Sequence, residues 1–126
     1  MDFTIEGCRI PMAFTLLAKK RLIEEFGSPE LLQASFQPED ESELAWNMSR
    51  IASIMSKAYQ RRKIALGKLH GEKDDSFPIE AEDLFSLLDR ESCLRLVESI
   101  TRTVSEANQA SVEVVPEKKD EAMPQK

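Results

Sequence analysis

The chain has 126 residues, of which 41% are hydrophobic, and a formal net charge of -6. This length and apolar share suit one domain with a modest core. The acidic balance disfavours general nucleic-acid binding, because contacts with phosphate dominate that affinity. No apolar run approaches the about 20 residues of a membrane-spanning helix, and the first residues lack the pattern of a signal peptide. We therefore expect a cytoplasmic protein that binds neither nucleic acid nor membrane.

Two short segments at the start of the chain alternate apolar and polar residues. The apolar positions are Phe3 and Ile5, followed by Ile10, Met12 and Phe14. Period two puts each set on one face of a strand, so the pattern predicts a β-hairpin. Glu6-Gly7 supplies the turn, and Pro11 makes the second strand an edge because proline has no amide hydrogen. A hairpin this small needs helices to cover its apolar face.

Two short helices are predicted next. Thr15 can cap a helix that Gly27 ends, because glycine readily adopts the positive φ found after a helix. Ser28 can cap a second helix with Pro29 at its first position. Leu31, Leu32 and Phe36 provide the apolar side of this helix, which ends before Pro38.

The rest of the chain predicts three further helices. The longest covers about 42–66 and is closed by Gly67, and a polar loop follows at 70–76. A short helix covers about 80–88, and Asp89 caps the last helix, at about 90–108. The predicted fold is α+β and mostly α, with an N-terminal β-hairpin packed on a small bundle of about five helices. We expect one domain over residues 1–110 and a disordered, flexible tail over 111–126.

No set of residues has the spacing of a known catalytic or metal site. Cys8 and Cys93 are far apart in sequence, form no CxxC pair and are expected to be free thiols. His70 is expected to be an exposed loop residue without an orienting partner. Glu72, Asp74 and Asp75 lack the spacing of a calcium loop. We therefore expect no enzyme activity, no cofactor and no metal.

A basic cluster marks the second half of the longest predicted helix. It consists of Lys57, Arg61, Arg62, Lys63 and Lys68. A solvated helix end, a protein-binding patch and a nucleic-acid contact each account for it, although no helix-turn-helix pattern accompanies the charges.

Large or flexible apolar residues, together with part of this basic cluster, form the candidate binding residues. Methionine and tryptophan are frequent at adaptable binding surfaces, but each such residue also suits a protein core. The candidates are Trp46, Met48, Met55, Tyr59, Arg61, Arg62, Leu94 and Val97.

The order of these motifs resembles the tail assembly chaperones of long-tailed phages and prophages. The resemblance rests on Phe3-Thr4-Ile5-Glu6-Gly7, on the apolar return strand up to Phe14, and on Glu24-Glu25-Phe26-Gly27. The acidic, leucine-rich segment 82–89 before the last helix adds to it. It spans about residues 2–108. Cys8 and Pro11 depart from a typical hairpin of this kind and leave its turn type open.

The resemblance implies a role in virion morphogenesis, inside the bacterial host cytoplasm. Such chaperones bind the long helical tape measure protein, shield its apolar surface and help to recruit subunits of the major tail protein. The resemblance therefore implies helix-in-groove binding, in which apolar surface between the longest and the last helix accepts a helix of the partner. Self-association of the chain into a homo-oligomer is a further alternative. The alternatives are a small regulatory adaptor that binds a globular host or phage protein and, third, a DNA-binding regulator.

Overall fold

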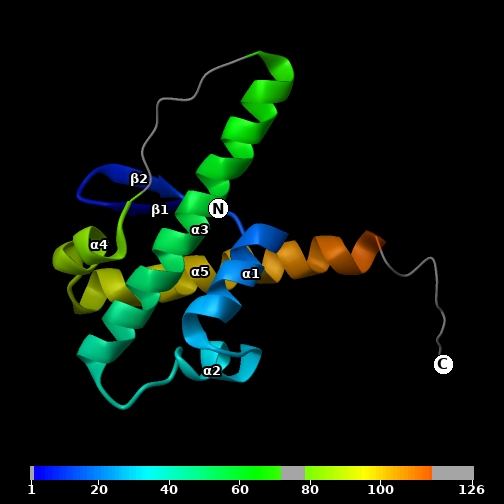
Figure 1. The fold of residues 1–126 in the computed structure, drawn as a ribbon. Coiled ribbons are helices and arrows are strands. Elements are labelled where there is room, and N and C mark those ends of the chain that lie inside the picture. Colours follow the sequence, from blue (N-terminus) through cyan, green and yellow to red (C-terminus); the bar gives the residue numbers. More distant parts are fainter. Residues whose placement is uncertain (1, 72–78, 115–126) are drawn as a thin grey trace, which may run out of the picture.

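The computed structural model describes residues 2–71 and 79–114 of the chain. Along the chain, its elements are β1 (Asp2–Ile5), β2 (Cys8–Pro11), α1 (Leu16–Phe26), α2 (Pro29–Ala34), α3 (Glu41–His70), α4 (Ala81–Leu87) and α5 (Arg90–Val114). The α+β prediction is confirmed: the described residues form a small antiparallel hairpin and five helices, and the hairpin contacts α3 and α5 (Figure 1).

The hairpin turns through Glu6 and Gly7, as predicted. Ile5 pairs with Cys8 and Phe3 with Ile10, so the loop between the strands has two residues. Both loop residues have positive φ, 51° for Glu6 and 77° for Gly7, which is what a type I′ turn requires. Phe3, Ile5 and Ile10 are buried on the face that contacts α3 and α5.

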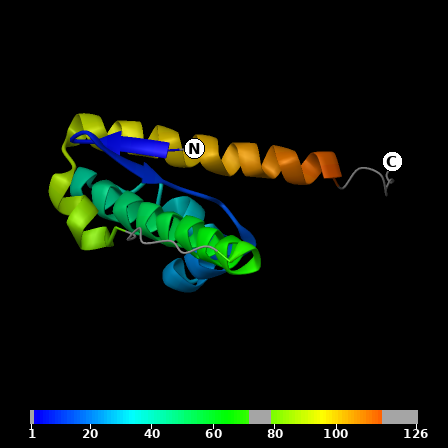
Figure 2. The same cartoon turned by 90° about the horizontal axis from the view of Figure 1, so that it is seen from above.

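The two long helices α3 and α5 cross, and the other elements fill the angles between them (Figure 1). Seen from above, α3 lies between α5 on one side and α1 and α2 on the other (Figure 2). The core is where these elements meet. Its largest fully buried side chains include Phe3, Met12, Leu22, Met48, Ile51, Met55, Leu84, Leu96 and Ile100.

The predicted caps of α1 and α2 are present. The Thr15 hydroxyl oxygen accepts a hydrogen bond of 3.1 Å from the Ala18 amide, and the Ser28 hydroxyl does the same for Leu31. Gly27 ends α1 with a φ of 107°, and its amide donates to the Ile23 carbonyl. Strong local capping explains why two helices this short form at these residues.

The two long helices extend further than predicted. Gly67 does not close α3: the helix continues to His70, and Gly71 is its left-handed cap. The Gly71 amide donates to the Gly67 carbonyl and closes the helix there, and a glycine inside a helix costs only about 1 kcal/mol. Helix α5 continues to Val114, so 111–114 belong to a helix and not to a tail. Residues 115–126, the rest of the expected tail, lie outside the described residues.

Side-chain hydrogen bonds fix both ends of α4. The Ser53 hydroxyl, on α3, donates to the Ile79 carbonyl at 2.8 Å and holds the chain just before α4. After α4, an Asp89 carboxylate oxygen accepts a hydrogen bond of 2.8 Å from the Ser92 amide, so Asp89 caps α5 as predicted.

Cys93, one turn into α5, is a buried free thiol whose pKa is raised by burial. Among the described residues, no helix has the length and apolarity needed to cross a bilayer.

Candidate functional site

An open groove of about 1240 Å³ lies between α5 on one side and α1 and α2 on the other. We call it the α2–α5 groove. It is lined by Phe14, Lys19, Leu22, Ile23, Pro29, Glu30, Leu32, Gln33, Ala34, Phe36, Gln37, Ile51, Ile100, Thr101, Val104, Ser105 and Asn108.

The floor and inner walls of the groove are apolar. Ile51 of α3 and Ile100 of α5 lie at the bottom and are almost wholly buried. Leu32 and Phe36 on one wall and Val104 on the other are half-buried side chains packed against the core. Half-buried apolar side chains on facing walls can bury further apolar surface when a partner enters.

The rim of the groove is polar but nearly uncharged. The α5 side presents Thr101, Ser105 and Asn108, all exposed. Lys19 and Glu30 are the only charged side chains among the lining residues, and their charges are opposite. The groove therefore offers little net electrostatic attraction to a partner of either sign.

The size of the groove favours a helix over a small molecule. Small-molecule sites enclose about 300–1,000 Å³ and bury most of the ligand. This groove is somewhat larger, is open to solvent and has α5 as one wall. An amphipathic helix that places apolar side chains at steps of three and four residues fits such a groove.

Helix α2 separates this groove from a smaller, more polar hollow of about 470 Å³. The second hollow is lined in part by Phe26, Leu31 and Arg50. The Arg50 guanidinium lies 4.2 Å from the centre of the Phe26 ring and also pairs with Glu25 at 2.9 Å. Hollows on both sides explain why α2 has no buried residue.

The eight candidate binding residues do not come together, and none of them lines the groove. Met48 and Met55 are completely buried and form part of the core. Neither can contact a client while the domain keeps this fold, because both side chains fill space between α3 and its neighbours. The prediction that Met48 and Met55 contact a binding partner is therefore wrong, because both are core residues.

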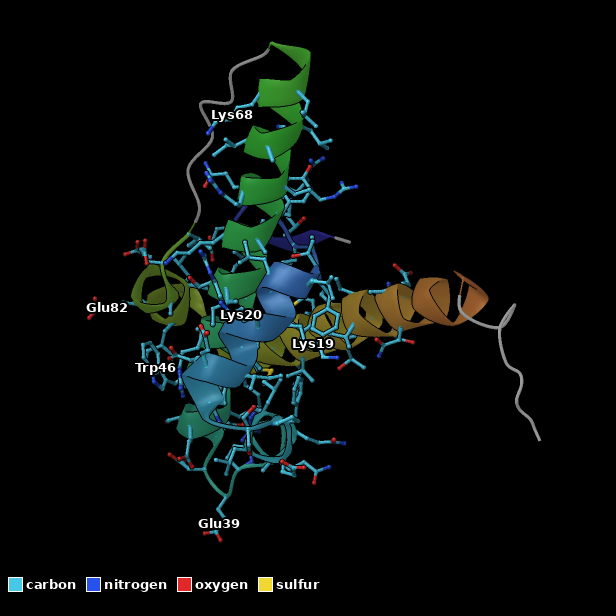
Figure 3. All side chains as sticks on the ribbon, turned by 45° about the vertical axis from the view of Figure 1, so that its right-hand side comes forward. Lys19, Lys20, Glu39, Trp46, Lys68 and Glu82 are labelled. Carbon is cyan, nitrogen blue, oxygen red and sulfur yellow. The ribbon has the colours of Figure 1, made fainter. Side chains whose placement is uncertain are left out.

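Trp46 lies on the surface where α3 meets α4. Its ring is 5.3 Å from the Phe85 ring in an edge-to-face arrangement, and 38% of the residue is exposed. Figure 3 shows Trp46 and Lys19 on opposite sides of α1, so Trp46 is remote from the groove rim that carries Lys19.

The other candidates are spread over two helices. Tyr59 is half-buried on α3, and Arg61 and Arg62 are exposed beyond it. On α5, Leu94 is 59% exposed, whereas Val97 is partly buried against the core. Helices α3 and α5 pack directly against each other, and Ile51 is the one α3 residue among those that line the α2–α5 groove.

The sequence reasoning missed the residues that make the groove. Leu32 and Val104 occupy apolar positions of amphipathic helices, and that pattern does reveal that they face inward, whereas Phe36 lies in the turn after α2. The pattern does not reveal that α2 and α5 stay apart, because this depends on how α1 and α2 cross α3.

The sequence predicts no metal site, and the structure describes only some of the residues that this prediction considers. Within 2–71 and 79–114, no three His, Cys, Asp or Glu side chains gather as metal ligands do. His70 is the last residue of α3 and not part of a loop. Glu72, Asp74 and Asp75 lie outside the described residues.

Comparisons of the chain with models of known protein families, with curated proteins and with solved structures find no match.

Proposed function

We propose that this protein is a tail assembly chaperone of a long-tailed phage or prophage. In this proposal, it holds a helical segment of the tape measure protein in the α2–α5 groove and helps to recruit tail tube subunits. The observation that carries the proposal is the groove itself, a large open cleft with an apolar floor and a nearly uncharged rim. The order of the sequence motifs supports the choice of partner.

The groove suits a client that is a long, mostly helical protein. A client helix would place successive apolar side chains against Leu32 and Phe36 on one wall and Val104 on the other. Each apolar side chain that becomes fully buried contributes about 1.5–3 kcal/mol. This covers apolar surface that would otherwise promote aggregation of the client.

Modest affinity for each copy suits a chaperone that must later leave. The loss of translational and rotational freedom costs about 4–15 kcal/mol, which offsets most of the gain from two or three buried side chains. Several copies along one long client would still cover it, because the client offers many similar segments.

Co-expression with the neighbouring long helical gene product tests the proposal. We expect the two proteins to co-purify and the client to become more soluble. Since the groove carries one cation and one anion at its rim, binding should change little with salt concentration. Absence of both co-purification and increased solubility would contradict the proposal.

A matched pair of double variants locates the binding surface. Thr101→Lys/Ser105→Lys adds two charged side chains at exposed positions of the groove rim, and should abolish co-purification. Ser42→Lys/Ser86→Lys makes similar changes at exposed helix positions that do not line the groove, and should leave co-purification intact. Equal binding by both variants would place the client elsewhere.

A further inference from the structure

The C-terminal end of α3 projects from the body of the domain (Figure 1). We call residues 61–70 the α3 arm. A stripe of positions whose steps alternate between four and three residues runs along α3 into this arm, and all of them are apolar except Arg62. Its positions are Leu44, Met48, Ile51, Met55, Ala58, Arg62, Ala65 and Leu69.

The stripe is covered in the body and uncovered in the arm. Met48, Ile51, Met55 and Ala58 are at most 1% exposed, whereas Leu69 is 82% exposed. Alternating steps of four and three are the a and d positions of a heptad repeat, which two helices use to pack along a shared seam. The arm therefore presents one half of such a seam.

The charges beside the seam are all positive. The arm contains Arg61, Arg62, Lys63 and Lys68 but no acidic residue. If Met55, Arg62 and Leu69 are a positions, then Arg61 and Lys68 are g positions, whose charges select the partner helix. Within the described part of the chain, no ion pair joins Arg61, Arg62 or Lys68 to a carboxylate.

We propose that the α3 arm is a second docking surface, which binds an acidic amphipathic helix of a partner protein by coiled-coil packing. Glutamates that flank the partner's apolar seam would pair with Arg61 and Lys68, and its apolar residues would cover Leu66 and Leu69. This surface is separate from the α2–α5 groove, because none of the arm's residues lines that groove.

A protein helix fits the arm better than two other occupants. A nucleic acid would pair with the cations but would leave the exposed Leu66 and Leu69 uncovered, and the net charge of -6 would repel it. A second arm from another copy would bring like charges together across the seam, which destabilises coiled coils.

Two synthetic peptides of about three heptads test the proposal, both with Leu at a and d, one with Glu and the other with Lys at e and g. Binding to the full chain is measured by fluorescence anisotropy at about 50 and about 500 mM salt. We expect the Glu peptide to bind at least ten times more tightly than the Lys peptide, and to weaken as salt increases.

Three variants make the outcome decisive. Arg61→Glu/Lys68→Glu should exchange the preference, so that the Lys peptide binds more tightly. Leu69→Asp should abolish binding of the Glu peptide, and the groove variant Thr101→Lys/Ser105→Lys should retain it. The proposal would be overturned by any of three results. These are an unchanged preference in Arg61→Glu/Lys68→Glu, loss of Glu-peptide binding in the groove variant, and tighter binding of duplex DNA than of the Glu peptide.

Discussion

The Asn47 side-chain amide donates a hydrogen bond of 3.0 Å to the Ser35 carbonyl and thereby ties the end of α2 to α3. The Asn47 side-chain oxygen accepts a second bond, of 3.3 Å, from the Arg50 guanidinium. Asn47 is buried, whereas α2 has no buried residue of its own. This polar contact therefore helps to position the helix that forms one wall of the groove.

Replacement of Asn47 by Ala should loosen that wall. The buried Ser35 carbonyl would lose its side-chain partner, and an unsatisfied buried polar group costs about 1–3 kcal/mol. We expect a lower free energy of unfolding in urea, and faster amide hydrogen exchange over residues 29–37 than in the wild type. Gln33→Ala, at an exposed position of α2, is the control and should change neither measurement appreciably. Unchanged exchange in Asn47→Ala would show that other contacts hold α2.

Replacement of Met55 by Ala separates a core role from a binding role. Because Met55 is completely buried, the shorter side chain should leave a cavity and destabilise the domain by about 2–5 kcal/mol. Arg61→Ala, at an exposed position on the same helix, should change stability by less than about 0.5 kcal/mol. Urea unfolding followed by circular dichroism measures both. A Met55→Ala protein of wild-type stability would contradict the packing of α3.

The local features of the fold were predictable because short-range chemistry decides them. Thr15, Ser28 and Asp89 accept backbone hydrogen bonds three residues ahead, and Glu6-Gly7 makes the turn between strands of opposite direction. Each of these depends on residues within one turn of helix or hairpin. The sequence pattern therefore predicts them without knowledge of the tertiary structure.

The position of the binding surface was not predictable in the same way. Met55 and Leu69 occupy equivalent positions of one helical stripe, yet one is buried and the other exposed. The difference arises where the body of the domain ends along α3, and no local pattern encodes that point. Gly67 illustrates the same limit, because Gly67 and Gly71 can each end a helix and no local pattern shows which of them does.

Replacement of Glu6 by Asn should stabilise the hairpin. Glu6 adopts a φ of 51°, a conformation that costs energy for most residues but that asparagine tolerates well. Asn-Gly is the preferred pair for a turn of this kind. We expect a gain of about 0.5–1 kcal/mol in the free energy of unfolding and a higher melting temperature. Glu6→Val, a β-branched residue that resists positive φ, should have the opposite effect. A lower melting temperature for Glu6→Asn would contradict the turn geometry.

The cap formed by Asp89 should make stability depend on pH. Hydrogen bonds from the backbone and side chain of Ser92 lower the pKa of the Asp89 carboxyl group below its ordinary value. A lowered pKa in the folded state means that the ionised form stabilises the fold. This stabilisation is complete above the pKa of the unfolded chain, about 3.9, and is lost as the pH falls through the lower folded-state value.

Urea unfolding of the wild type and of Asp89→Ala at a series of pH values tests this linkage. The variant should be less stable at pH near 7, and the difference between the two proteins should shrink as the pH falls from about 5 to about 2. Asp89→Asn retains a side-chain oxygen that can accept from the Ser92 amide but has no ionisable group. Its stability relative to Asp89→Ala should therefore stay constant over the same range. A wild-type advantage over Asp89→Ala that persists unchanged at the lowest pH would show that the charge of Asp89 does not stabilise α5.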